Sequence, residues 1–255
     1  MKPLDFMIVG AQKCGTTALS EFLDEHPDIQ MSTPKEVHLF DDEAFWAGSP
    51  AGQDIQRRYQ QAFEENTTSL TGEATPVYLY FTEIAERLRR YNPALKIIVI
   101  LRDPVERAYS HYRMEFERGN ETLPYWQALW KEGRRLSEDN NKYHEDSAHR
   151  RHSYRARGCY AEQLLALYAC FPARQIMVIH NEDLRVSHQQ VMKRLFVFLG
   201  VPDAQVSART VFSGGSDIRE VPWVSRILRL SFWFEIKRLA RLVEFDVSPW
   251  RRLIN

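Results

Sequence analysis

Three short apolar segments without polar alternation constrain the fold of this chain more than any other feature. They are residues 6–9 (Phe-Met-Ile-Val), 96–101 (Lys-Ile-Ile-Val-Ile-Leu) and 175–179 (Gln-Ile-Met-Val-Ile). Continuous apolar runs rich in β-branched residues are typical of parallel strands that are buried on both faces of a sheet. The three segments are therefore predicted to be strands of one mainly parallel sheet.

Helical patterns separate these segments. The pattern near residues 104–118 has a well-formed start, because Asp103 can cap the helix, Pro104 suits its first position and Glu106 lies in its first turn. Alternating strands and helices predict an α/β fold, with helices flanking a central, mainly parallel sheet in a single domain of residues 1–255. The expected helices lie near residues 16–26, 81–91, 104–118, 160–171 and 187–199.

Two segments fall outside this alternation. Residues 131–157 are charged and lack periodicity, so we expect an exposed loop or lid there. Residues 220–255 are expected to be a C-terminal helical segment. Its mixture of Leu, Phe and Trp with Arg and Lys is compatible with peripheral contact with a membrane surface. Helices packed on the core show the same pattern, and packing is the favoured interpretation.

Composition limits the partners and the compartment. The 255 residues hold 34 Lys and Arg against 34 Asp and Glu, so a net charge of zero gives no bulk attraction to nucleic acid. Three cysteines without CxxC spacing argue against a disulfide framework or a cysteine-based zinc site. The first residues lack signal-peptide architecture, and no segment approaches the roughly 20 apolar residues of a membrane span. A cytoplasmic protein without a transmembrane segment is expected.

The first predicted strand leads into a candidate phosphate loop, residues 10–19 (Gly-Ala-Gln-Lys-Cys-Gly-Thr-Thr-Ala-Leu). A strand, a glycine turn and a helix start direct backbone N–H groups at one point, where the helix dipole favours an anion. The P-loop pattern of nucleoside triphosphatases has lysine directly after its second glycine. Here Thr16 holds that place and Lys13 lies inside the loop, where it can reach the bridging oxygen of a group linked to a 5′-phosphate.

A second phosphate site is predicted after the strand of residues 96–101. Arg102 follows this strand at its carboxyl end, where open α/β sheets bind ligands. Ser110, two turns into the next helix, can join Arg102 on one phosphate. In a competing interpretation Asp103 is a magnesium ligand, but we favour its role as the helix cap.

Together these residues resemble the sulfotransferases that use 3′-phosphoadenylyl sulfate (PAPS). Residues 13–19 resemble their 5′-phosphosulfate loop, and residues 101–110 (Leu-Arg-Asp-Pro-Val-Glu-Arg-Ala-Tyr-Ser) resemble their 3′-phosphate motif. Residues 35–40 (Lys-Glu-Val-His-Leu-Phe) are similar to a segment of the heparan sulfate N- and O-sulfotransferase branch that contains a catalytic glutamate. The similarity runs from about residue 6 to residue 200, and it implies a P-loop-kinase-like α/β fold.

The resemblance implies roles for individual residues. Glu36 matches the general base, with His38 beside it, and residues two apart on an extended segment face the same side. Lys13 would stabilise the leaving phosphate. The residues implied to bind the donor, with 3′-phosphoadenosine 5′-phosphate (PAP) as product, are Lys13, Cys14, Gly15, Thr16, Thr17, Ala18, Arg102, Ser110 and, in a loosely matching loop, Arg219.

One departure from the family concerns the acceptor, which is expected to be the hydroxyl or amine of a carbohydrate or small molecule. The heparan O-sulfotransferases have a lysine where residues 72–76 (Gly-Glu-Ala-Thr-Pro) place Ala74. Either Lys35 supplies this charge or the acceptor is less anionic than heparan.

Two other functions predict different chemistry. A P-loop nucleotide kinase or NTPase would depend on magnesium, and a non-catalytic nucleotide-binding protein would not need Glu36. No metal is expected for sulfuryl transfer, since the leaving group lies among positive groups. His144, His149 and His152 fall in a densely charged segment, which favours a solvated loop over a metal site.

Overall fold

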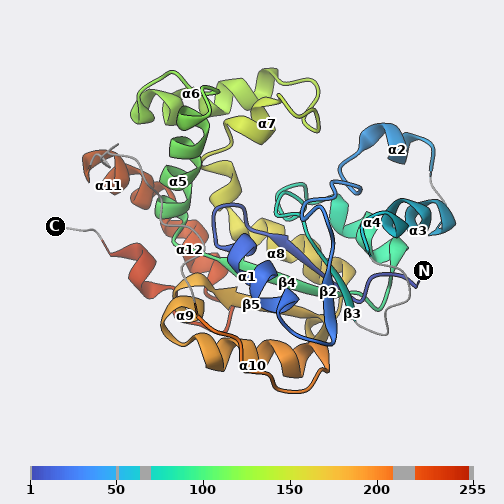
Figure 1. Ribbon diagram of the computed structural model, residues 1–255. Coiled ribbons are helices and arrows are strands. Elements are labelled where there is room, and N and C mark those ends of the chain that lie inside the picture. Colours follow the sequence, from blue (N-terminus) through green and yellow to red (C-terminus); the bar gives the residue numbers. More distant parts are fainter. Residues whose placement is uncertain (1, 50–51, 64–69, 209–221, 253–255) are drawn as a thin grey trace. The chain divides into compact units, whose positions relative to one another are not determined.

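The computed structural model describes residues 2–49, 52–63, 70–208 and 222–252 (Figure 1). The chain divides into two compact units, residues 1–101 with 165–213 and residues 102–164 with 214–255. The single domain expected over the whole chain stays a prediction.

The first unit contains a five-stranded sheet with the order β2-β3-β1-β4-β5. All four strand pairs are parallel, which confirms the predicted α/β class. The three strands predicted from apolar runs are the neighbours β1, β4 and β5, whose residues are almost all buried. The strands are β1 (Phe6–Gly10), β2 (Ile29–Met31), β3 (Leu70–Ala74), β4 (Lys96–Leu101) and β5 (Ile176–His180).

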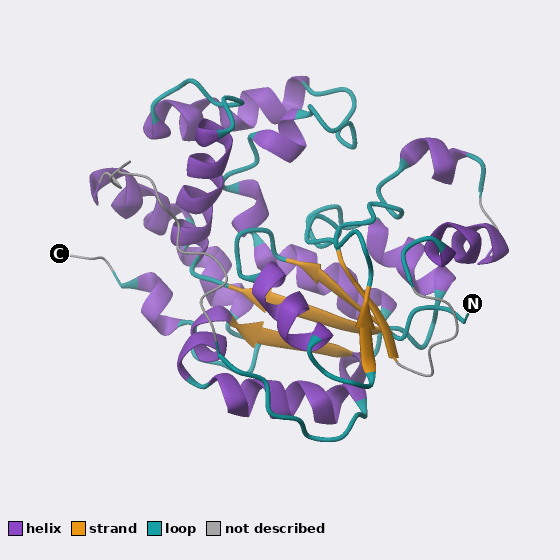
Figure 2. Cartoon of the chain, viewed as in Figure 1, coloured by secondary structure: helices purple, strands orange, loops and turns teal. Residues whose placement is uncertain are grey.

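Strand order explains where a ligand can bind in this unit. The chain passes from β1 to β2 and β3 on one side and then to β4 on the other side. Open α/β sheets bind ligands at the carboxyl ends of their strands, at such a reversal of order. Helix α1 (Thr16–Asp24) leaves this end of β1 and packs across β1, β2 and β3, on the face of the sheet toward the viewer in Figure 2.

Several helices of the first unit were expected from their apolar periodicity, whereas α2, α3 and α9 were not. Four of the expected helices are present as α1, α4, α8 and α10, and α8 begins in the second unit and ends in the first. Besides α1 the elements are α2 (Glu43–Ala47), α3 (Gly52–Gln60), α4 (Ile84–Tyr91), α8 (Tyr160–Cys170), α9 (Asn181–Val186) and α10 (His188–Leu199).

The second unit is helical in its described residues. Its α5 begins as predicted, with Pro104 at the first position and the side chain of Asp103 accepting a hydrogen bond from the Val105 N–H at 2.9 Å. The helices are α5 (Pro104–Glu117), α6 (Tyr125–Glu138), α7 (Ala148–Arg151), α11 (Pro222–Ser231) and α12 (Trp233–Leu239).

The loop expected over residues 131–157 is wrong for much of its length, although many residues of the segment are exposed as expected. Helix α6 continues to Glu138, and α7 and a 3-10 turn at Ala156–Gly158 follow. The buried carboxylate of Glu132 accepts hydrogen bonds from the backbone N–H groups of Arg155 and Ala156. A charge in this segment can therefore be buried and bind backbone groups, whereas Lys131, Arg134 and Glu145 are exposed.

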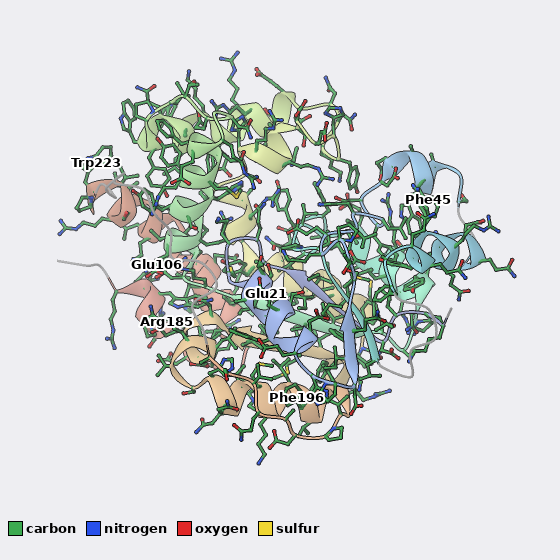
Figure 3. The ribbon with its side chains drawn as sticks, viewed as in Figure 1. Glu21, Phe45, Glu106, Arg185, Phe196 and Trp223 are labelled. Carbon is green, nitrogen blue, oxygen red and sulfur yellow. The ribbon has the colours of Figure 1, made fainter. Side chains whose placement is uncertain are left out.

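The C-terminal helices are amphipathic in the structure. Val224 and Leu228 of α11 are buried, as packing on a core requires. On the other face, Ile227 is 60% exposed and Trp223, labelled in Figure 3, is 52% exposed. Among the described residues, no helix is both long and apolar enough to span a bilayer.

Candidate active site

The predicted phosphate loop joins β1 to α1 in a conformation with two left-handed residues. Lys13 has a φ of 69° and Gly15 a φ of 100°, on either side of the buried Cys14. The Cys14 N–H donates to the Ala11 carbonyl at 3.1 Å, so this donor closes the turn itself. Left-handed residues in such a turn bring successive backbone N–H groups to one side, which forms an anion-binding concavity.

Helix α1 begins at this concavity. Its N-cap residue, Gly15, has no side chain that could cap the helix, and the first turn contains no acidic residue. The first N–H groups of a helix have no partner within it, and they carry the positive end of the helix dipole. Thr16, Thr17 and Ala18 therefore offer backbone donors to an anion, with half-buried Lys13 in the same loop.

Asn181 fixes the shape of this loop. It begins α9 directly after β5, and its Nδ2 donates to the Cys14 carbonyl at 2.6 Å. A Cβ atom on Gly15 would lie 2.7 Å from the same Nδ2, so this position needs glycine for its space as well as for its φ. Asn181 was not identified from the sequence, although the predicted strand of residues 175–179 ends two residues before it.

A second group of side chains follows β2. The His38 Nε2 lies 3.4 Å from Glu36 Oε2, and its Nδ1 lies 2.9 Å from Asp41 Oδ2. One imidazole therefore bridges two carboxylates, of which Asp41 is fully buried. His38 has a φ of 56°, a left-handed conformation that costs energy for a residue with a side chain. Asp41, three residues beyond His38, was not identified from the sequence.

Lys35 also contacts the Glu36 carboxylate, with Nζ 2.7 Å from Oε1. Burial acts to raise the pKa of Glu36, but the hydrogen bonds and charges of His38 and Lys35 outweigh it and lower the pKa to about 2. Glu36 is thus ionised at neutral pH. The structure brings Lys35, Glu36 and His38 together, although His38 is left-handed and the segment is not extended as the spacing argument assumed.

Backbone contacts hold this segment, residues 36–41, in place. Arg87 of α4 donates to the Phe40 carbonyl at 2.8 Å, and the Trp46 indole donates to the Leu39 carbonyl at 2.9 Å. The Phe40 N–H donates to the hydroxyl of Tyr78 at 3.2 Å. Three side chains from other parts of the unit therefore fix two consecutive peptide groups next to the candidate base.

Ala74 ends β3 beside β1, paired with Ile8, and is fully buried. Its predecessor Glu73, also fully buried, accepts hydrogen bonds from the hydroxyls of Tyr59, Thr75 and Tyr78. The sequence interpretation did not assign a role to Glu73. The sequence around it, Gly72-Glu73-Ala74, contains nothing that indicates that the Glu73 carboxylate is buried.

In the second unit, Arg102 precedes α5 and forms an ion pair with Glu106 at 2.9 Å; Glu106 is labelled on α5 in Figure 3. Ser110 lies further along α5 and is half-buried, and no hydrogen bond joins it to Arg102 in the described part of this unit. Asp103 is paired with the buried Arg229 at 2.6 Å. Arg219 lies outside the described residues.

No group of three or more His, Cys, Asp or Glu side chains in the described ranges is arranged to hold a metal ion. In the charged segment, His149 Nε2 lies 3.2 Å from the Leu136 carbonyl, and His152 lies beside Tyr154 and Glu121. The histidines of this segment therefore contact protein groups.

Known proteins are similar to this chain in sequence and in structure. A sulfotransferase domain model matches residues 3–213. A sulfotransferase from Alicyclobacillus acidocaldarius superimposes with a TM-score of 0.79 and 30% identity, covering 99% of this chain and 100% of that one. The chain belongs to the sulfotransferase family.

Curated sulfotransferases from animals are similar over a shorter part of their length. Heparan sulfate glucosamine 3-O-sulfotransferase 3A1 of Mus musculus is 28% identical over 76% of this chain and 45% of its own. The bifunctional heparan sulfate N-deacetylase/N-sulfotransferase 3 of Homo sapiens is 30% identical over 77% of this chain and 22% of its own. The chain thus spans less than half the length of these sulfotransferases. The suspected family is confirmed.

Proposed function

We propose that this chain transfers a sulfuryl group from PAPS to a hydroxyl or amine of a carbohydrate or small-molecule acceptor. The observation that carries the proposal is the uncapped, acid-free N-terminus of α1 with Lys13 in its loop. This arrangement suits a phosphate at the carboxyl end of β1. The group formed by Lys35, Glu36 and His38 follows β2 and supplies the base that sulfuryl transfer needs.

A magnesium-dependent kinase is less well supported. Its candidate magnesium ligand is Asp103, which already accepts hydrogen bonds from the Val105 N–H and from Arg229. A carboxylate committed to a helix start and to a buried arginine is poorly suited to bind a cation as well. The donor set around the phosphate loop is cationic and N–H-rich, and it fits a phosphosulfate without a metal.

The proton is taken up by the group around Glu36. Ionised Glu36 accepts a hydrogen bond from the acceptor hydroxyl or amine and receives its proton as the group attacks sulfur. We propose that His38, whose Nε2 lies 3.4 Å from Glu36 Oε2, assists by orienting this carboxylate toward the acceptor. Asp41 orients the imidazole through Nδ1.

PAPS, when bound, supplies the sulfuryl group, whose bond to the 5′-phosphate oxygen breaks as its bond to the acceptor forms. Lys13 and the first N–H groups of α1 stabilise the negative charge on the departing phosphate. Because these donors are fixed before the reaction, they cost little reorganisation during it. Arg102 and Ser110 are proposed to bind the 3′-phosphate.

The acceptor class follows from the relatives and from Lys35. The two animal relatives are named for heparan sulfate, a carbohydrate with glucosamine hydroxyl and amine groups. At the place of the family lysine this chain has the buried Ala74. The contact of Lys35 with Glu36 supports the proposal that Lys35 supplies the missing charge.

Nucleotide binding tests the donor. We expect PAP to raise the melting temperature more than ADP, AMP or ATP with magnesium, and EDTA to leave this shift unchanged. At 100 times its Kd a ligand stabilises a protein by about 2.7 kcal/mol, which raises the Tm by roughly 5–10 °C at this size. Preference for ATP with magnesium over PAP would refute the proposal.

Matched variants test the residues. Lys13→Ala is expected to reduce the PAP-induced shift, whereas Lys193→Ala, a control on an exposed lysine of α10, is expected to leave it unchanged. Glu36→Gln is expected to keep the PAP shift and lower sulfuryl transfer by about 100-fold or more. Full turnover by Glu36→Gln would exclude Glu36 as the base.

A further inference from the structure

Glu73 is a buried carboxyl group for which the reaction described above has no use. It lies in β3 next to the strand end and has no exposed surface. Oε1 accepts hydrogen bonds from the hydroxyls of Thr75 and Tyr78, the latter at 3.0 Å, and Oε2 accepts one from Tyr59 of α3. Within the part of the chain that is described, no lysine, arginine or histidine forms an ion pair with it.

The hydrogen bonds from the three hydroxyls only partly offset the cost of burying the ionised Glu73 carboxylate. Burial raises the pKa of Glu73 to about 7, although the three hydroxyls and the charge of His38 act in the opposite direction. All three hydrogen bonds need the carboxylate as acceptor. A protonated Glu73 has a proton of its own to donate, so at least one hydroxyl must then change its hydrogen bond.

Tyr78 connects Glu73 to the candidate base. The Tyr78 hydroxyl donates its only proton to Glu73, and its lone pair accepts the Phe40 N–H at 3.2 Å. Phe40 belongs to the segment that carries Glu36, His38 and Asp41. The hydrogen bond to Glu73 therefore fixes the orientation in which the Tyr78 hydroxyl accepts the Phe40 N–H, and because the site is buried, water does not replace a partner that is lost.

We propose that Glu73 is a positioning residue of the sulfotransferase reaction: its carboxylate orients the Tyr78 hydroxyl, which holds the Phe40 peptide and thereby the segment of Glu36 and His38. Protonation of Glu73 weakens the hydrogen bond that Tyr78 donates to it, because a neutral carboxyl oxygen is a poorer acceptor than a carboxylate, and this loosens that segment. This inference rests on the function proposed above, since it assigns Glu36 and His38 to the reaction.

Turnover then depends on pH through Glu73, a residue that does not itself contact the substrates. The ionised form of Glu73 is the active form, so activity falls as the pH falls through about 7. Glu36 does not produce this change, because its pKa is about 2. The titratable groups that face Glu73 are Tyr59 of α3, Tyr78, Tyr91 of α4 and, by its charge, His38; Asp41 acts on Tyr78.

Glu73→Gln tests the proposal by its pH profile. The amide keeps the size of the side chain but does not titrate. We expect kcat to fall by about tenfold at pH 8, the acid limb near pH 7 to disappear, and the KM for PAPS to stay unchanged. An acid limb that persists unchanged in Glu73→Gln belongs to His38 or another group and overturns the proposal.

Tyr78→Phe tests the connection and guards against a Glu73 variant that does not fold. Loss of a donor to the carboxylate disfavours its charged form, so the acid limb is expected to move to higher pH as kcat falls. Tyr91→Phe is the matched control, since Tyr91 donates no hydrogen bond to Glu73 and accepts the Leu4 N–H instead. Equal pH profiles for both variants overturn the proposal.

An NMR measurement separates this inference from the proposed function. The Phe40 amide signal is expected to titrate near pH 7 in the unmodified protein and to stop doing so in Glu73→Gln. This holds whether or not the protein accepts PAPS, so a protein without transferase activity refutes the function alone. A Phe40 amide that does not titrate near pH 7, or titrates equally in Glu73→Gln, refutes the role of Glu73.

Discussion

Replacing Gly15 with alanine perturbs the phosphate loop at its most constrained residue. The substitution adds one methyl group to a residue with a φ of 100° and brings it within 2.7 Å of Asn181 Nδ2. Either the loop takes a new backbone conformation, or Asn181 moves and loses its hydrogen bond to the Cys14 carbonyl. Both responses alter the concavity at the start of α1.

The size of the effect follows from two contributions. A left-handed residue with a Cβ atom costs about 1–2 kcal/mol more than glycine. The hydrogen bond of Asn181 contributes about 0.5–1.5 kcal/mol. We therefore expect a total loss of about 1.5–3.5 kcal/mol, divided between the free energy of unfolding and the free energy of PAP binding. A loss that falls wholly on binding corresponds to a Kd about 10- to 400-fold higher.

Urea unfolding and PAP titration calorimetry of the same variants measure both parts. Gly119→Ala is the matched control, because Gly119 has a φ of 76° but nothing lies within 4 Å of an added Cβ atom. It should show the conformational cost alone and no change in PAP affinity. In an Asn181→Ala background the Gly15→Ala substitution should also cost only this smaller amount.

The reasoning is refuted if Gly15→Ala binds PAP with unchanged affinity and loses no more stability than Gly119→Ala. A cost that stays the same in the Asn181→Ala background would show that the close approach to Asn181 does not matter. In that case the left-handed conformation would be the whole reason for glycine at this position.

Three further predictions concern other parts of the chain. Gly133→Ala should raise the free energy of unfolding by about 0.5–1 kcal/mol in urea, since Gly133 lies inside α6 with nothing within 4 Å of an added Cβ atom. Arg102→Ala should reduce the thermal shift by PAP but leave that by AMP unchanged, because only PAP carries the 3′-phosphate. Burial opposes ionisation of Glu121, but hydrogen bonds from His152 and Arg135 outweigh it and lower its pKa. Its stabilising contribution is therefore complete above about pH 4.5, its ordinary value, and is lost below it. Glu121→Gln should flatten this acid dependence, and an unchanged pH dependence of urea unfolding would contradict the reasoning.

The central part of the sheet was predictable because burial on both faces leaves a continuous apolar signature. This holds for β1, β4 and β5. The strands β2 and β3 lack it, since β2 has only three residues and β3 reads Leu-Thr-Gly-Glu-Ala. Gly72 is needed because an added Cβ atom would lie 2.1 Å from the Phe6 ring. Such close packing between neighbouring strands depends on tertiary contacts that a pattern along the chain does not contain.

The residues of the candidate site also fall into two groups, those that local spacing predicts and those that only tertiary contacts bring to the site. Residues joined by local spacing, such as Lys13 with the start of α1 and Glu36 with His38, were found from the sequence. Asn181 and Glu73 reach the site from distant segments, and nothing in their neighbours along the chain indicates their partners. Residues 131–157 misled for a different reason, since their dense charge hides the helices α6 and α7, and one of the charges, Glu132, is buried against backbone N–H groups.

Two of the three described non-glycine residues with left-handed backbone are candidate catalytic residues, Lys13 and His38. Glycine or asparagine would adopt these conformations at lower cost, so the backbone conformation itself does not call for lysine or histidine there. A protein of this family that had lost its chemistry could accept Gly or Asn at both places and still fold. Positions 13 and 38 therefore offer a marker for separating active members from inactive ones, which a match to the fold does not distinguish.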